Sequence, residues 1–202
     1  MALIGDHQLG NAMVALAALN HLRPYFPALS ATAVRQGLAD VTWNGRLQTV
    51  YQSEQTATFL VDCAHNPDSV ARLVDALNHH YTYQRLILLF GAPADKDVAK
   101  MLAPLVPLAY LTITAAADHP RAAQPESLAQ IVRELGGTAV IAASAAEGLT
   151  TAWQNAQPGD PHLRHRLHHL CWRLAKSVGQ LKIKLVGPRG TIAHNGRYPP
   201  LA

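Results

Sequence analysis

The sequence predicts an α/β fold in which helices cover a doubly wound, mainly parallel sheet. From residue 43 onwards, short apolar segments alternate with amphipathic segments of helical length, which is typical of strands joined by crossover helices. One expected strand, residues 85–90, is mostly a continuous apolar run of the kind that is buried in a parallel sheet. Hydrophobic residues make up 49% of the 202 residues and charged residues 15%, which indicates a packed core.

The first forty residues predict two helices that precede the sheet. Residues 7–22 are rich in Ala, Leu and Met, which are strong helix formers, and Asp6 is the expected N-cap. Ser30 is the expected N-cap of a second helix over residues 31–38. Because two such helices are too small to bury a core of their own, we expect residues 1–42 to be the end of a larger domain.

The remaining elements follow in order along residues 43–160. The expected strands are residues 47–51, 56–62, 85–90, 109–114 and 139–142, and the expected helices are residues 68–79, 97–105, 126–135 and 145–157. The first two strands are separated by a short polar turn, so we expect them to be neighbours in the sheet. Ligands of doubly wound sheets bind beyond the carboxyl ends of the strands. This rule selects residues 62–66, 91–97 and 114–121 as the candidate site loops.

The chain lacks the patterns of membrane and secreted proteins. Its longest strongly apolar stretch, residues 86–90, is far shorter than a membrane span, and no signal-peptide pattern opens the sequence. Cys63 and Cys171 form neither a metal-binding spacing nor a disulfide framework. These features predict a cytoplasmic protein with no membrane association and no metal site of its own.

Charge is distributed unevenly along the chain. Residues 1–160 contain nine Lys/Arg and thirteen Asp/Glu, whereas residues 161–202 contain eight Lys/Arg and no acid. A basic tail can bind nucleic acid, but aromatic residues do not interleave with the basic ones here, so we expect no such partner. A metal cluster is an open alternative, although no carboxylate or thiolate completes a defined site; its histidines are His162, His165, His168 and His169.

Residues 59–67, Phe-Leu-Val-Asp-Cys-Ala-His-Asn-Pro, are the sharpest candidate for a binding site. An apolar strand ends in Asp62, and the following turn carries His65 and Asn66 just before a helix whose N-terminus favours anions. Asp62 is suited to accept hydrogen bonds from ribose hydroxyls, and His65 to face a phosphate or a carboxylate. From the residues alone, the alternative in which Asp62 caps the helix and His65 is a surface residue stays open.

Two other segments each carry one candidate ligand. Arg46 follows a glycine turn immediately before the first strand, where its guanidinium is placed to reach a nucleotide phosphate. Asn11 lies near the start of the first helix, in the segment of residues 5–12, and presents an exposed amide. Each is equally consistent with an ordinary solvated side chain.

In this order and spacing, the three segments resemble folylpolyglutamate synthase/dihydrofolate synthase, of the Mur ligase superfamily. The patterns are Gly-x-His-Gln-x-x-Asn-Ala at residues 5–12, Trp-x-Gly-Arg-Leu at 43–47 and Asp-x-Ala-His-Asn-Pro at 62–67. A loop ending in Asp-Lys-Asp at 95–97 also matches, and the resemblance runs from about residue 3 to residue 160. Cys63 stands where Gly is usual in the family, and Gln48 where Glu is common.

The resemblance implies a Rossmann-like Mur ligase C-terminal domain over residues 43–160 and an ATP-dependent, Mg²⁺-requiring activity. In the family, ATP phosphorylates a carboxylate of dihydropteroate or folate, and the amine of glutamate attacks the acyl phosphate. By this resemblance, Asn11 contacts adenine, Arg46 reaches the phosphates and Asp62 holds the ribose. His65, expected to be catalytic, and Asn66 would lie near the phosphoryl group or the incoming glutamate.

The sequence lacks two parts that the family places in a preceding ATPase domain. No segment matches the Gly-rich phosphate loop with its Lys and Ser, and the acidic and His ligands of Mg²⁺ have no counterpart. We therefore expect residues 1–42 to be a remnant of that ATPase domain and the chain alone to be inactive as a ligase. The alternative function is a non-catalytic α/β module that binds a partner or a nucleotide weakly.

Residues 161–202 are expected to be an aberrant basic tail. The family has a strand containing Thr-Gly-Ser after a Gly-Asp pair such as residues 159–160, and an out-of-phase reading of codons permitted for residues 161–175 can encode it. We therefore expect a frameshift near residue 161, with a genuine basic arm as the alternative. A frameshift predicts a disordered or loosely helical tail and a sheet edge with unpaired backbone groups.

Overall fold

The computed structural model describes residues 3–52, 58–83, 85–117, 119–156 and 168–172. The helices are α1 (Asp6–Leu22), α2 (Ala31–Asp40), α3 (Pro67–His80), α4 (Val98–Leu102), α5 (Pro125–Glu134) and α6 (Ala145–Asn155), with short 3₁₀ turns η1 (Arg23–Tyr25) and η2 (Val106–Leu108). The strands are β1 (Gln48–Gln52), β2 (Thr58–Val61), β3 (Arg85–Phe90), β4 (Ala109–Thr114), β5 (Ala139–Ile141) and β6 (His168–Trp172).

The strands form one six-stranded sheet in the order β1-β2-β6-β3-β4-β5. Strand β1 runs antiparallel to β2, and the other neighbouring strands are parallel. The predicted doubly wound, mainly parallel α/β sheet is therefore confirmed. The expected strands at residues 85–90 and 109–114 are found with the same bounds.

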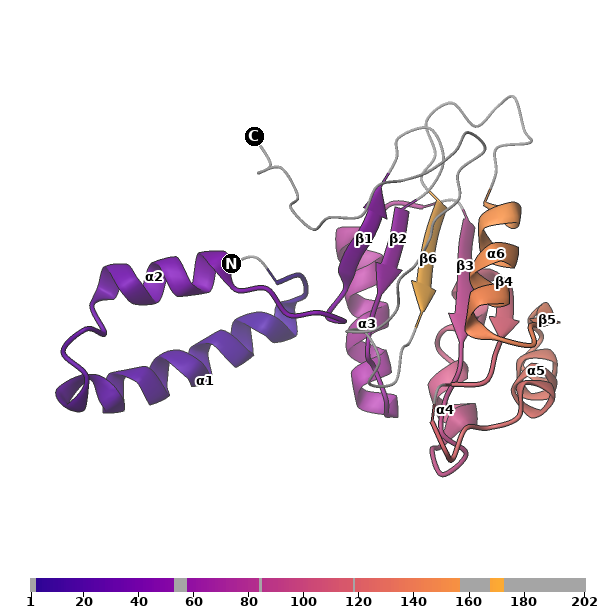
Figure 1. The fold of residues 1–202 in the computed structure, drawn as a ribbon, viewed down its shortest axis with the longest axis horizontal. Helices are drawn as coiled ribbons and strands as arrows, with labels where there is room; N and C mark the ends of the chain where they lie inside the picture. The colour runs from indigo at the N-terminus through magenta and orange to yellow at the C-terminus, as the bar shows by residue number, and fades with distance from the viewer. Residues whose placement is uncertain (1–2, 53–57, 84, 118, 157–167, 173–202) are drawn as a thin grey trace.

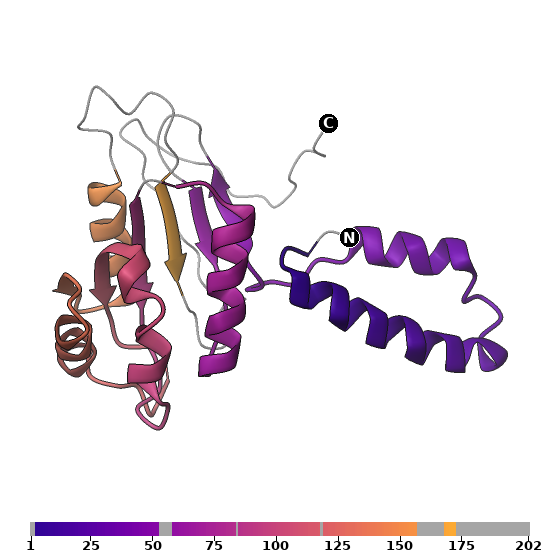
Figure 2. The ribbon, with the colours of Figure 1, turned by 180° about the vertical axis from the view of Figure 1, so that it is seen from behind.

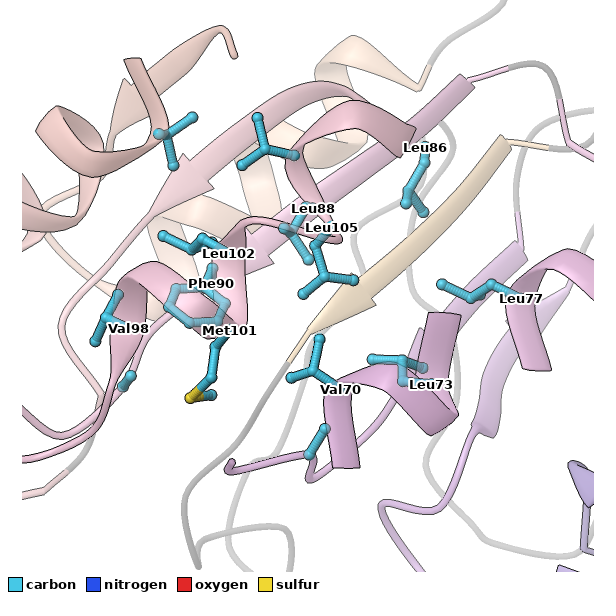
Figure 3. Packing of buried hydrophobic residues seen from close by; sticks show 14 of the residues in the cluster. Val70, Leu73, Leu77, Leu86, Leu88, Phe90, Val98, Met101, Leu102 and Leu105 are labelled. Carbon is cyan, nitrogen blue, oxygen red and sulfur yellow. The ribbon is translucent and has the colours of Figure 1, made fainter. Parts of the chain in front are cut away.

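One face of the sheet is covered by α3, α4 and α5 (Figures 1 and 2). Helix α3 turns Val70, Leu73 and Leu77 towards the sheet at helical spacing, which is the reason this segment forms an amphipathic helix (Figure 3). They belong to one cluster with Leu86 and Leu88 of β3, both of which are almost fully buried. This cluster fixes α3 against the sheet and so positions the loop that precedes it.

Helix α6 covers the opposite face. Phe59 of β2 stacks on Trp153 of α6 with ring centroids 5.2 Å apart, and Leu89 and Ile113 complete the buried cluster on this side. The side chains of β3 alternate between the two clusters, with Leu88 on one face and Leu89 on the other. The central strands are thus buried on both faces, as their continuous apolar sequences predict.

Residues 168–172 form strand β6, which differs from the disordered or loosely helical tail that the sequence predicted. Its backbone lies in the interior of the sheet, parallel to β2 and β3, with His169 paired to Thr58 on one side and to Leu86 on the other. The prediction of a disordered or loosely helical segment is therefore wrong for residues 168–172, and these residues do not leave an open edge. The physical reason is that β2 and β3 each present backbone N–H and C=O groups along one edge. An extended segment between them can form hydrogen bonds with both strands. Residues 157–167 and 173–202, and with them the expected frameshift site, lie outside the described part.

The α1–α2 hairpin projects away from the sheet (Figures 1 and 2). Gln8 is the buried residue of α1, whereas large apolar side chains such as Met13 and Val14 are about 70% exposed. Ser30 caps α2 as predicted, because its hydroxyl accepts the N–H of Ala33 at 3.1 Å. The expected N-cap Asp6 is wrong: Gly5 occupies that position without a side-chain bond, and Asp6 is the first helical residue. None of the described helices is long and apolar enough to span a bilayer.

Candidate functional site

A cavity of about 560 Å³ opens where the start of α1, the turn before β1, the end of β2 and the start of α3 meet. Three of the predicted ligands, Asn11, Arg46 and Asp62, line this cavity although they are up to 51 residues apart in sequence. The described residues that line it are His7, Gly10, Asn11, Val14, Arg46, Leu47, Asp62, Asp68, Ser69, Arg72 and Leu73. The volume is in the range of small-molecule sites.

On the α1 side, the amide of Asn11 is held by a row of polar side chains. The Nδ2 group of Asn11 donates to Oε1 of Gln8 at 3.0 Å, and Nε2 of Gln8 donates to Nε2 of His7 at 3.0 Å. Gln8 is 6% exposed, so its buried side chain fixes the positions of the His7 and Asn11 side chains. Asn11 itself is exposed and lines the cavity, and its amide has further donor and acceptor capacity beyond the bond to Gln8.

Arg46 lies in a tight turn whose backbone conformation at residue 45 favours glycine. Gly45 has a φ of +75°, its N–H donates to Oε1 of Gln48 at 3.0 Å, and the N–H of Arg46 donates to the carbonyl of Trp43 at 3.3 Å. A Cβ atom on residue 45 would collide with Sγ of Cys63, so the turn and the strand end are in direct contact. Gln48, which replaces the Glu common in the resembling family, supplies the acceptor that closes this turn.

Asp62 is 9% exposed, and both of its carboxylate oxygens accept backbone hydrogen bonds. Oδ2 accepts the N–H of Leu47 at 2.9 Å, and Oδ1 accepts the N–H of Ala64 at 2.7 Å. Burial raises the pKa of Asp62, and the two N–H groups together with the charges of Arg46 and His7 oppose part of that rise. The alternative in which Asp62 caps the next helix is wrong, because Asn66 is the N-cap of α3.

His65 and Asn66 lie beside the cavity and do not line it. The Asn66 side chain accepts the N–H of Ser69 at 2.8 Å, and the Ser69 hydroxyl accepts the N–H of Asn66 at 3.1 Å, which makes a reciprocal capping box. His65 is exposed, and its Nδ1 atom lies 3.2 Å from the carbonyl of Cys63. The structure thus gives Asn66 a local role, and the substrate roles of His65 and Asn66 stay predictions.

Sequence reasoning missed the α3 wall of the cavity. Asp68, Ser69 and Arg72 lie on the first turns of α3 and line the cavity opposite α1. Nη2 of Arg72 lies 3.9 Å from Oδ1 of Asp68, an i,i+4 pair in which both side chains are largely exposed. Helical spacing relative to the buried Leu73 places positions 68, 69 and 72 on one flank of α3, but only the fold shows that the start of α1 lies across the cavity from them.

The other two candidate loops, residues 91–97 and 114–121, are joined to each other at the carboxyl ends of β3 and β4. The N–H of Ala94 donates to the carbonyl of Arg121 at 2.7 Å, and Nη1 of Arg121 pairs with Asp95 at 2.9 Å. Asp97 caps α4 and forms an ion pair of 2.8 Å with Lys100, which holds the pKa of the Asp97 carboxyl below its usual range. The described residues of these loops do not line the cavity.

The acidic, histidine and cysteine side chains of the described residues are scattered with respect to a metal ion. Within the described part of the chain, no three His, Cys, Asp or Glu side chains gather closely enough to hold an ion. Among the described residues that line the cavity, the acids are Asp62 and Asp68, and each Asp62 oxygen already accepts one N–H group. By themselves, the described residues do not complete the octahedral set of oxygen ligands that Mg²⁺ requires, which in nucleotide sites includes phosphates and waters. The side chains of the tail histidines lie outside the described part.

Comparisons with known proteins identify the family of the chain. The family "Mur ligase, glutamate ligase domain" matches residues 45–163. A Haloferax volcanii protein named "Probable bifunctional folylpolyglutamate synthase/dihydropteroate synthase" is 35% identical over 159 residues, which are 78% of this chain and 18% of that protein. The dihydrofolate synthase/folylpolyglutamate synthase of Mycobacterium tuberculosis is 34% identical over 142 residues, 68% of this chain and 28% of the relative.

A solved structure extends the likeness to the fold. The crystal structure of Mycobacterium tuberculosis folylpolyglutamate synthase complexed with ADP and AMPPCP superposes with a TM-score of 0.73 at 29% identity, over 86% of this chain and 39% of that one. The chain thus spans well under half the length of these relatives. The family match covers more than half of the chain and leads to one assignment: the chain belongs to the Mur ligase family and carries its C-terminal, glutamate ligase domain.

Proposed function

We propose that the chain is the C-terminal part of a cytoplasmic ligase that uses ATP to join glutamate to dihydropteroate or folate, and that the cavity receives the nucleotide. The observation that carries this proposal is the convergence of Asn11, Arg46 and Asp62 on one cavity from three separate segments. The resemblance assigned these residues to adenine, phosphate and ribose. ADP and AMPPCP are bound by the Mycobacterium tuberculosis protein whose fold the chain shares, which supports a nucleotide as the ligand.

The residues present fit a nucleotide. The exposed guanidinium of Arg46 offers charge-assisted hydrogen bonds to phosphate oxygens, and the Asn11 amide offers a donor and an acceptor to a base edge. When bound, ATP supplies the phosphoryl group that activates a carboxylate for attack by the amine of glutamate. In this proposal, the chain's own residues bind and orient the nucleotide, while His65 and Asn66 lie on the loop beside the cavity to meet the second substrate.

We further propose that residues 1–42 belong to the ATPase domain of the complete ligase. The relatives are much longer than the part that matches this chain. Helix α1 also exposes apolar side chains, which a neighbouring domain would cover. The phosphate loop and the Mg²⁺ ligands would come from that domain. The chain alone would then bind ATP but not turn it over.

Binding by the chain alone tests the site. Because no phosphate loop contributes, we expect an ATP Kd in the millimolar range or weaker, measured by NMR titration. Arg46→Ala should weaken binding about tenfold, since one charge-assisted contact is lost. Arg35→Ala, which removes an exposed arginine of α2 remote from the cavity lining, is the matched control and should have no effect.

An assay of ADP release tests whether the chain needs the ATPase domain for ligase activity. The pure chain should release no ADP with ATP, a folate substrate and glutamate, and release should appear when the ATPase portion of a relative is fused ahead of residue 1. Steady-state turnover by the chain alone would contradict the proposal that it is incomplete. Binding without turnover in the fusion would favour the alternative, a non-catalytic module that binds a nucleotide weakly.

A further inference from the structure

We propose that Asp62 is a positioning residue for Arg46: its carboxylate holds the turn that aims the Arg46 guanidinium into the cavity. This inference rests on the proposed function, in which Arg46 receives the phosphates of a nucleotide. It differs from the ribose role that the resemblance implies, because Asp62 here acts on the ligand through another side chain.

The first support is the backbone conformation on the C-terminal side of Arg46. Leu47 has a φ of +44°, and it is the non-glycine residue with positive φ in the described chain. A leucine in this region is sterically unfavourable and persists only where surrounding contacts determine it. The contact that does so is the hydrogen bond from the Leu47 N–H to Oδ2 of Asp62, 2.9 Å long and buried. The side chain of Leu47 is 4% exposed and packs in the hydrophobic core, which also fixes the position of this residue.

The second support is that Arg46 is clamped on both sides by the same short segment. On its N-terminal side, the carbonyl of Gly45 accepts the N–H of Cys63 at 2.9 Å. On its C-terminal side, Leu47 is bonded to Asp62, and Asp62 is in turn fixed by the N–H of Ala64 at 2.7 Å. The backbone of Arg46 therefore has little freedom, while its side chain stays exposed at the cavity. Rigid placement of a cation lowers the entropy that its ligand contact would cost.

The third support is how the Asp62 carboxylate is used. The side chain is 9% exposed, and each oxygen already accepts one backbone N–H group. A carboxylate oxygen can accept more than one hydrogen bond, so each Asp62 oxygen can receive a ligand hydroxyl in addition to its backbone N–H group. The two bonds that are present join Leu47 and Ala64 through one buried carboxylate, and the ligands below separate this positioning role from a ribose contact.

Three ligands separate the positioning role from the ribose role: ATP, 2′,3′-dideoxy-ATP and inorganic tripolyphosphate. If Asp62 acts through Arg46, Asp62→Asn should weaken the binding of all three by a similar factor, approaching the roughly tenfold loss expected for Arg46→Ala. In an Arg46→Ala background, the same substitution should add less than about twofold, because neighbouring residues that act together are not additive. A loss confined to ATP, or a full additional loss in the double variant, would overturn the inference.

Amide hydrogen exchange gives a readout that needs no ligand. In the wild type, the Leu47 amide should be protected, and Asp62→Asn should speed its exchange while the Leu88 amide in β3 is unchanged. Asp75→Asn, an exposed acid on α3 outside the cavity, is the matched control and should change neither amide. An unprotected Leu47 amide in the wild type would overturn the inference even if the Asp62 variant did not fold.

The two readouts also separate this inference from the proposed function. If the wild type binds none of the three ligands, the proposed function fails, and the positioning role fails with it because Arg46 then has no phosphate to meet. If the wild type binds but Leu47 exchange and the double-variant cycle show no coupling, only the positioning role fails. Coupled loss in both readouts supports the inference.

Discussion

The hairpin and the sheet use apolar residues in opposite ways. In α3, the apolar residues Val70, Leu73 and Leu77 are buried against the sheet, and the polar face points outwards. In α1, apolar side chains are distributed around the helix, and Met13 and Val14 are about 70% exposed. A helix that is apolar all round is typical of a buried position. The exposed apolar surface of α1 therefore supports our proposal that residues 1–42 belong to a larger domain, whereas α3 buries its apolar face within the described chain.

The largest expected effect on the free energy of unfolding comes from replacing one leucine in each region by alanine. Leu89 is fully buried between β3 and α6, and Leu9 of α1 is 58% exposed. Leu89→Ala should lower the free energy of unfolding by about 2–5 kcal/mol, because a cavity remains in a close-packed core. Leu9→Ala should change it by no more than about 0.5 kcal/mol. Denaturant unfolding of both variants measures the contrast, and equal losses would show that the hairpin is packed in solution.

A second contrast uses two glycines and should give effects of opposite sign. Gly45→Ala places a Cβ at a φ of +75° and against Sγ of Cys63, so we expect a loss of about 1–3 kcal/mol. Gly37 lies inside α2 with no atom near its missing Cβ. Gly37→Ala should therefore favour the helix by up to about 1 kcal/mol. Circular dichroism follows α2, and denaturant unfolding follows the sheet. A stabilising Gly45→Ala would contradict the contact between the turn and the strand end.

Local pattern predicted most elements because each of them is decided by neighbouring residues. The apolar run of residues 85–90 becomes β3, and the amphipathic spacing of Val70 to Leu77 becomes α3, with bounds within a residue or two. The N-cap of α1 was missed by one position, since Gly5 adopts a φ of +110° that ends the preceding segment and leaves Asp6 inside the helix. Such errors are confined to element ends.

The features that escaped prediction are those decided across the fold. The place of β6 depends on β2 and β3, which lie about a hundred residues earlier, and its own sequence has no clear strand alternation. The convergence of Asn11, Arg46 and Asp62 was implied by the family resemblance and not by spacing. The bond from Leu47 to Asp62 joins residues 15 apart through a backbone conformation that leucine disfavours, so no propensity indicates it.

The smallest expected effect contrasts a buried and an exposed acid within the sheet domain, and it concerns pH. Burial raises the folded-state pKa of Asp62 above its ordinary value of 3.8, so the folded chain binds this proton more tightly than the unfolded chain. The Asp62 contribution to stability is then fully present below 3.8 and is lost as pH rises through the folded-state pKa. Relative to Asp62→Asn, the wild type should therefore gain stability as the solution is acidified through that window.

Asp97 should behave in the opposite way. Its pairing with Lys100 lowers the folded-state pKa below 3.8, so its contribution is present above 3.8 and is lost as pH falls through the lowered value. Relative to Asp97→Asn, the wild type should lose stability on acidification, and only slightly, because the pair is exposed and screened by solvent. Urea unfolding of the three proteins between pH 3 and pH 7 measures both slopes, since acids common to all three cancel in the differences. Slopes of the same sign for the two variants would mean that the N–H groups of Leu47 and Ala64 and the charge of Arg46 outweigh the effect of burial on the Asp62 pKa.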